Sequence, residues 1–233
     1  QTAKNLTTAQ TNTHVGSAAG GSGVITGSGN TTLGYAAGYA LSSGTYNTFL
    51  GSTSGWSTTT GENNIGIGYK TLYANVDGDN NIAIGHEALV DFEANSDGEG
   101  ENIAIGYRAG FEVSTGIQNI FIGHESGAGN ASAVTTGPLN VAVGRRAGYV
   151  LQGAATLNAI IGANAGLALT EGTHNTFIGA SSGGNATTGI ENTCLGYNCD
   201  IYDATATNQI VIGNNLTGTD LDNSVYIGNN TNH

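Results

Sequence analysis

The sequence predicts an all-β fold, a parallel β-solenoid of about twelve coils, and one repeated pattern carries that prediction. A five-residue unit, Asn-x-x-Φ-Gly with Φ an aliphatic residue, recurs through nearly the whole chain. Its closing glycines are Gly34, Gly51, Gly68, Gly85, Gly106, Gly123, Gly144, Gly162, Gly179, Gly196, Gly213 and Gly228. They are separated by 17, 17, 17, 21, 17, 21, 18, 17, 17, 17 and 15 residues. Self-similarity at one dominant period is typical of stacked repeat architectures.

Composition excludes the other regular folds. The 233 residues include 39 glycines, one proline and no methionine, and only 9% are charged. Helical bundles and coiled coils need many more Leu, Glu, Lys and Ala residues, and collagen needs far more proline. The net charge of −12 repels nucleic acid and anionic membranes, so we expect neither as a partner. No apolar run approaches the roughly 20 residues that span a bilayer, so we expect no membrane insertion by this segment.

Glycines at fixed offsets mark two turns in each period. One lies three residues before the asparagine in most copies, and another lies four residues after the closing glycine in seven copies. The stretches between them are short and rich in β-branched residues, which favours strands over helices. Each period is therefore expected to be one coil, with a short strand, a turn, a second extended piece and another turn. The 21-residue periods carry four-residue insertions.

Side-chain alternation within the strand suggests a core. The third residue after the asparagine is Leu, Ile or Val in all twelve copies, and the first is Thr, Ile, Val or Ala. These two positions share a face, so we expect them to stack into the interior, with Leu33 over Leu50 over Ile67. The middle residue is also mostly apolar, so the opposite face needs a cover. A neighbouring chain is the most economical one.

The recurrent asparagine is interpreted as structural. We expect each side chain to bond its counterpart in the next coil or to cap a turn. This predicted ladder contains Asn30, Asn47, Asn64, Asn81, Asn102, Asn119, Asn140, Asn158, Asn175 and Asn192. The repeat domain covers residues 27–230, and its last two copies are ragged from about residue 208. Residues 1–26 are set apart as an extended lead-in, a cap or a strand donated to a neighbour.

The units Asn81–Gly85 and Asn102–Gly106, each read Asn-Ile-Ala-Ile-Gly, resemble the head repeat of YadA-like trimeric autotransporter adhesins. Similar Thr-Gly-x-x-Asn-Thr-x-Ile-Gly repeats occur in bacteriophage tail fibres. The resemblance covers about residues 27–230. It implies a left-handed parallel β-roll, a side-by-side homotrimer and a non-enzymatic adhesive or receptor-binding role. The expected location is extracellular, at a cell surface or on a virion fibre.

One column of rings is the candidate ligand-binding surface. It follows the closing glycine and contains Tyr35, Tyr69, His86, Tyr107, His124 and Tyr197. Flat rings with polar tips suit a surface glycan or a protein receptor. The alternative is that the rings cover turn backbone or lie at the trimer interface. We predict no catalytic residues, because Ser181 of the Gly179–Gly183 Gly-x-Ser-x-Gly match shares its column with residues of either charge or none.

The remaining polar features point weakly to metal or to assembly. An acidic insertion is the candidate calcium site, and a solvated loop is the alternative. Its carboxylates are Asp91, Asp97, Glu99 and Glu101. The spacing of Cys194 and Cys199 matches no zinc or redox motif. The chain ends could be capped or could join head to tail into a filament. Threonines before the turn glycines suggest an ice- or mineral-binding solenoid as a further alternative.

Overall fold

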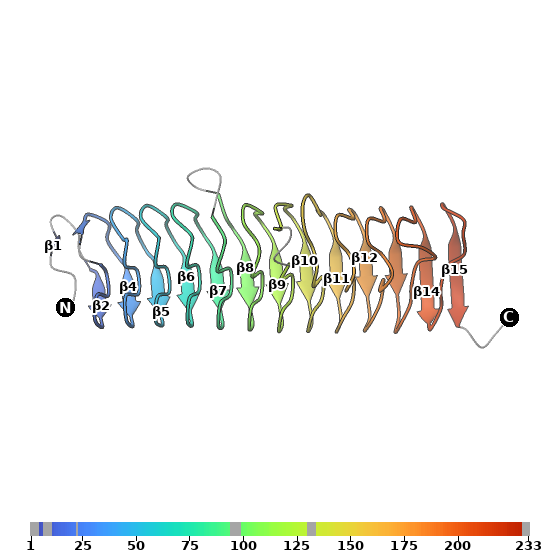
Figure 1. Cartoon of the computed structure of the whole chain (residues 1–233), viewed down its shortest axis with the longest axis horizontal. Coiled ribbons are helices and arrows are strands. Elements are labelled where there is room, and N and C mark those ends of the chain that lie inside the picture. Colours follow the sequence, from blue (N-terminus) through green and yellow to red (C-terminus); the bar gives the residue numbers. More distant parts are fainter. Residues whose placement is uncertain (1–4, 7–10, 22, 94–98, 130–133, 230–233) are drawn as a thin grey trace. The chain divides into compact units, whose positions relative to one another are not determined.

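A computed structural model describes residues 5–6, 11–21, 23–93, 99–129 and 134–229. The chain divides into two compact units, Gln1–Gln118 (unit 1) and Asn119–His233 (unit 2). The strands of each unit are drawn as parallel arrows in Figure 1. No helix occurs within the described ranges.

Unit 1 is built from very short strands. They are β1 (Asn5–Leu6), β2 (Thr13–Val15), β3 (Val24–Ile25), β4 (Thr31–Leu33), β5 (Thr48–Leu50), β6 (Ile65–Ile67), β7 (Ile82–Ile84) and β8 (Ile103–Ile105). Strand β1 pairs with β3, and β2 pairs with β4. From β4 to β8 each strand pairs with the next one along the chain, always in parallel.

Unit 2 repeats this arrangement. Its strands are β9 (Ile120–Ile122), β10 (Val141–Val143), β11 (Ala159–Ile161), β12 (Thr176–Ile178), β13 (Thr193–Leu195), β14 (Ile210–Asn214) and β15 (Val225–Asn229). Each is parallel to the next. The register places equivalent repeat positions side by side, as in Thr176↔Thr193 and Ile178↔Leu195. The prediction of an all-β parallel solenoid of about twelve coils is confirmed.

The expected core face was wrong. The middle residue of the strand points inward, and Phe49, Phe121 and Phe177 are all 0% exposed. The third residue points outward, and Leu33 and Leu195 are 49% and 44% exposed. The asparagine explains the inversion. Side chains alternate along a strand, so a buried asparagine carries the second residue after it into the interior and turns the first and third to the outside.

The asparagine side chains form a buried ladder in each unit. Asn30 Oδ1 accepts both the backbone N–H of Asn47, at 2.9 Å, and its Nδ2, at 3.1 Å. Asn47 Nδ2 also donates to the carbonyl of Gly61 in the following coil, at 2.7 Å. Buried amides are tolerated when their donors and acceptors are bonded in this way. The ladder runs through Asn64, Asn81 and Asn102 in unit 1, and through Asn119, Asn140, Asn158, Asn175 and Asn192 in unit 2.

A further coil begins within the stretch that the sequence analysis set apart as a lead-in. Strand β2 pairs with β4 in the repeat register, Thr13↔Thr31 and Val15↔Leu33. Asn12 Oδ1 accepts the backbone N–H of Asn30 at 2.7 Å, as the ladder asparagines do. The motif is present in the sequence as Asn-Thr-His-Val-Gly from Asn12 onward.

Candidate functional site

The candidate rings are held by a tight turn at the end of each strand. The closing glycine has a left-handed conformation, with φ of +136° at Gly144, and the residue two places later is also left-handed, with φ of 55° at Arg146. A β-carbon on Gly144 would lie 2.5 Å from the carbonyl oxygen of Gly162 in the next coil. Glycine is required there both by conformation and by the close approach of the backbones. The same turn therefore recurs and aims equivalent side chains outward.

Three of the six candidate rings form a stack in unit 1. The ring centroids of Tyr69 and His86 are 5.0 Å apart, and those of His86 and Tyr107 are 5.4 Å apart. Tyr35 lies on the same unit with 59% exposure, two coils before Tyr69, and His124 and Tyr197 lie on unit 2. Because His86 contacts a ring on each side, an external ligand would meet ring edges and polar tips in this stack.

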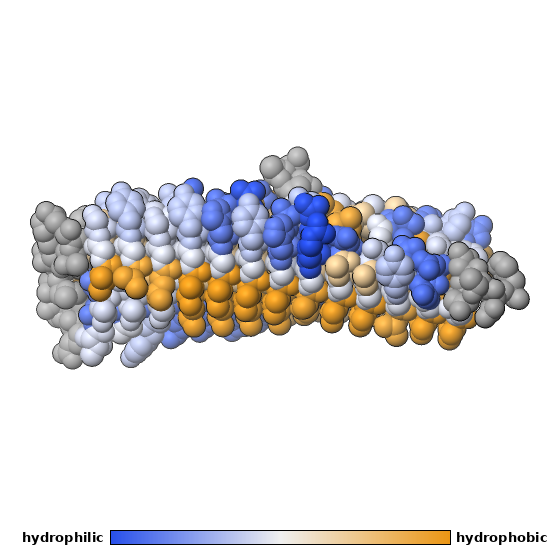
Figure 2. All heavy atoms as spheres, turned by 90° about the horizontal axis from the view of Figure 1, so that it is seen from below, coloured by the Kyte–Doolittle hydropathy of each residue, from blue (hydrophilic) through white to orange (hydrophobic). Residues whose placement is uncertain are grey.

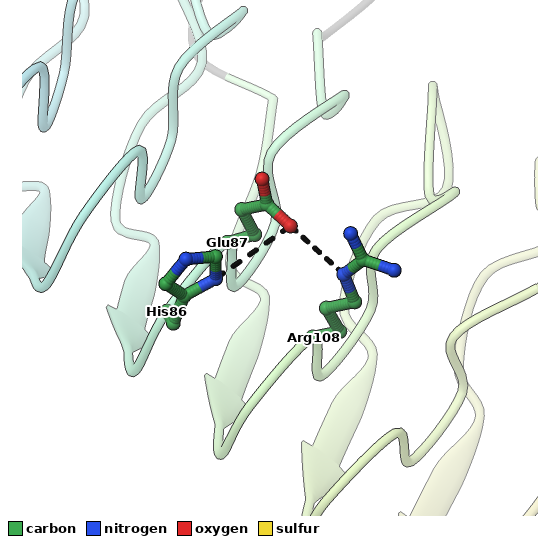
Figure 3. Close-up of polar contacts among 3 residues, drawn as sticks. All are labelled: His86, Glu87 and Arg108. Carbon is green, nitrogen blue, oxygen red and sulfur yellow. Dashed lines mark hydrogen bonds and ion pairs between the residues drawn. The ribbon is translucent and has the colours of Figure 1, made fainter.

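A charged column accompanies the rings. Arg108 Nε donates to Glu87 Oε2 at 2.8 Å, and His86 Nδ1 lies 3.6 Å from the same oxygen (Figure 3). Unit 2 repeats the arrangement, with Arg146 Nε 2.7 Å and His124 Nδ1 3.6 Å from Glu125 Oε2. Hydrogen bonding and charge attraction by Glu125 raise the pKa of Arg146. Neighbouring coils thus bring opposite charges into contact.

Sequence reasoning missed a second column of rings, five residues after the closing glycine. Tyr39 and Trp56 stack with their centroids 4.5 Å apart, and Trp56 lies 6.0 Å from Tyr73. Lys70 Nζ lies 5.4 Å from the Tyr69 ring and 5.5 Å from the Tyr73 ring, so it bridges the two columns. The signal was available, since aromatic residues recur at this offset as Tyr39, Trp56, Tyr73, Phe111 and Tyr149.

We call the rings of these two columns that contact one another or a cation, together with the cations, the unit 1 aromatic surface. Arg108 extends it, because its guanidinium lies 5.4 Å from the Tyr107 ring and 4.6 Å from the Phe111 ring. Cation–π contacts hold both long cationic side chains against rings rather than free in water. The members are Tyr39, Trp56, Tyr69, Lys70, Tyr73, His86, Tyr107, Arg108 and Phe111.

The first and third residues of the strands make an exposed apolar face, here called the outer strand face. Figure 2 shows it as a band of orange side chains on each unit. On unit 1 it includes Leu33, Ile67 and Ile105, and on unit 2 Ile161, Ile178 and Leu195, all exposed. Contiguous apolar surface of this kind is typical of an interaction face.

The calcium candidates are only partly described. Asp97 lies outside the described residues. Glu101 Oε2 accepts a hydrogen bond from Gln118 Nε2 at 2.8 Å. Burial and the nearby Glu87 carboxylate raise the pKa of Asp91, and burial and Asp91 raise that of Glu112. Within the described ranges, no three His, Cys, Asp or Glu side chains come together as a metal site.

Three threonine hydroxyls of the ice-binding alternative bond to protein carbonyls. Thr59 Oγ1 donates to Val76 O at 3.4 Å, Thr136 Oγ1 to Gly153 O at 2.8 Å, and Thr187 Oγ1 to Ala204 O at 3.1 Å. Each acceptor is 17 residues further on, in the following coil. These hydroxyl protons are therefore directed along the solenoid and not toward an external lattice.

Ser181, in the Gly-x-Ser-x-Gly match, occupies the left-handed turn position. Its φ is 56°, as is that of Asn164, and its backbone N–H donates to Ala163 O at 2.9 Å.

No protein-family model, curated protein or solved structure matches this chain. Within the described residues, no helix is long and apolar enough to cross a membrane.

Proposed function

We propose that the chain is a non-enzymatic extracellular fibre module for adhesion or receptor binding. The observation that carries this proposal is the unit 1 aromatic surface, in which exposed and half-buried rings and two cations recur on successive coils of a hydrogen-bonded scaffold. Contacts that are individually weak gain strength when one partner engages several of them. The resemblance to adhesin heads and tail-fibre repeats supports the same role at a cell surface or on a virion fibre.

The partner is a surface glycan or a protein receptor. Tyrosine hydroxyls and cations offer hydrogen bonds to hydroxyls and carboxylates, and ring edges offer apolar contact. Ring-to-ring stacking occupies both sides of Trp56 and His86. The net charge of −12 opposes nucleic acid and anionic membranes as partners. Catalysis and cofactors play no part in the proposed role.

The binding test measures retention on immobilised surface glycans and on immobilised receptor extracts. We expect the double change Tyr69→Ala and Tyr107→Ala to reduce retention of the chain. Tyr46→Ala is the matched control, because Tyr46 is a 67% exposed tyrosine of unit 1 outside the aromatic surface. Equal retention of both variants, or turnover of a glycan by the purified chain, contradicts the proposal.

Self-association is the second part of the proposal. Three chains would pack side by side and cover their outer strand faces. The face is apolar and repeats at the strand spacing of about 4.8 Å, so another copy of the chain matches it in both respects. Light scattering is expected to give the mass of a trimer. A monomer at micromolar concentration contradicts this arrangement.

A filament subunit is the alternative that a specific observation favours. Among the described residues β15 is the last strand of its sheet and pairs with β14, and its Val225 and Ile227 side chains are 61% and 74% exposed. An apolar strand edge of this kind favours pairing with another chain. Electron microscopy separates the alternatives, since long polymers favour the filament and discrete particles favour the fibre module. Ice binding is disfavoured as a function because threonine hydroxyls donate to carbonyls of the following coil. A thermal-hysteresis assay tests it.

A further inference from the structure

The two cysteines of the chain lie in the interior of one coil. Cys194 is the middle residue of β13, and Cys199 follows in the turn. Both thiols are free and both residues are 0% exposed. The chain contains no other cysteine.

The repeat geometry brings these two positions together. In the coil of β6 the same two positions hold Gly66 and Thr71, and a β-carbon on Gly66 would lie 2.9 Å from Thr71 Oγ1. A disulfide requires β-carbons roughly 3.5–4.5 Å apart. A β-carbon this close to Thr71 Oγ1 lies no further than that from the β-carbon of Thr71, because the oxygen is bonded to it. The two positions therefore lie close enough for a pair of cysteine side chains to meet across the coil.

Hydrogen bonds distinguish the two thiols. Cys199 Sγ lies 3.0 Å from the carbonyl oxygen of Val211, the residue paired with Cys194 in β14. The thiols also share a hydrogen bond, which raises the pKa of Cys194 and lowers that of Cys199. The two sulfurs are therefore in contact in the folded coil.

We propose that Cys194 and Cys199 close into a disulfide within their coil when a low-molecular-weight disulfide such as oxidised glutathione is present. The thiolate of either cysteine attacks that disulfide, forms a mixed disulfide and releases one glutathione thiolate. The other cysteine then loses its proton and attacks the protein sulfur of the mixed disulfide, which expels the second glutathione. The two protein thiols lose two electrons, the added disulfide gains them, and both protons end on glutathione.

Burial sets the stage at which this reaction occurs. An oxidant does not reach thiols that are 0% exposed, so the bond forms before the coils of β14 and β15 stack over the pair. The rest of the repeat shows that the fold does not need the bond. Ser182 stands at the position of Cys199 one coil earlier, and its Oγ donates to Cys194 O at 2.9 Å. Alanines stand at the position of Cys194 in β7, β8 and β10.

The test refolds the chain from denaturant in a buffer of reduced and oxidised glutathione, with acid quenching and alkylation under denaturing conditions. We expect the intact mass to fall by two hydrogen atoms, with no alkyl groups added and a single chain on a non-reducing gel. Prior treatment with dithiothreitol restores two alkylation sites. The control variants Cys194→Ala and Cys199→Ser use residues found at these positions in other coils, and each should keep one alkylatable thiol. Two alkylated thiols after oxidative refolding, stable glutathione adducts, or disulfide-linked dimers overturn the proposal.

Discussion

At the scale of single residues, the asparagine ladder depends on each member holding several partners at once. Asn64 Oδ1 accepts the backbone N–H and Nδ2 of Asn81, both at 3.0 Å, and its Nδ2 donates to Gly78 O at 2.8 Å. Asn64→Ala leaves the buried backbone N–H of Asn81 without its acceptor and takes one donor from Asn47 Oδ1 and one from Gly78 O. We expect it to lower the free energy of unfolding by about 2–4 kcal/mol, measured by urea denaturation. Asn185→Ala, at an exposed position, is the control and should change it little.

The closing glycine is the second residue on which every coil depends. Alanine at Gly144 would combine a φ of +136° with a β-carbon 2.6 Å from the carbonyl carbon of Gly162. We expect Gly144→Ala to lower the free energy of unfolding by about 3 kcal/mol or more. Gly184→Ala is the matched control, because its β-carbon would meet Asp200 Oδ2 at 3.6 Å, an ordinary contact. Equal thermal melting temperatures for the two variants would falsify this account.

Asp200 makes stability depend on pH. Burial raises its pKa to about 6 from 3.8, although the backbone N–H groups of Asn185 and Ile201 donate to it. The Asp200 carboxyl therefore binds a proton more tightly in the folded state than in the unfolded state. Above pH 6 the buried carboxylate charge destabilises the folded state, and this effect fades as the pH falls toward 4. We expect Asp200→Asn to melt at a higher temperature than the wild type at pH 7.5. That difference should shrink at pH 5, and a constant difference contradicts the assignment.

At the scale of the strand, the sequence predicted where each strand lies and how it pairs with its neighbours, but not which of its two faces is buried. Recurrent asparagine and glycine set the bounds of β4–β13, because both residues are demanded by backbone contacts between coils. Apolar residues at all three strand positions could not show which face was inside. The buried asparagine decides it, since the interior must also satisfy the amide groups. The ring column five residues after the glycine was missed because its residue type varies from coil to coil.

Strand β12 offers a direct test of the face assignment. Phe177 is 0% exposed and Ile178, its neighbour, is 36% exposed. We expect Phe177→Ala to lower the free energy of unfolding by about 3–5 kcal/mol, since it leaves a cavity beside Gly183. Ile178→Ala in the isolated chain should cost about 1 kcal/mol or less. If urea denaturation shows the larger loss for Ile178→Ala, the third strand residue lies in the core, as the sequence analysis expected.

At the scale of the whole molecule, folding and assembly use different faces of the same strands. Ile105 and Ile161 belong to the outer strand face and are 37% and 41% exposed. Replacing either with lysine puts a charge on the proposed contact between chains while the interior is unchanged. We expect Ile105→Lys and Ile161→Lys to reduce the mass in light scattering to that of one chain, with the β-type circular dichroism spectrum kept. An unchanged mass contradicts packing through this face.

The ladder has one more consequence, for the history of the gene. Each asparagine accepts hydrogen bonds from the coil that follows and donates to the coils on both sides, so all inner coils present the same pair of joining surfaces. Seventeen residues can then be duplicated or excised as a block, and the flanking coils meet again with every bond restored. Chain length in such a molecule is free to vary by recombination in whole steps, and variants that differ by one complete repeat should fold as readily as their parent.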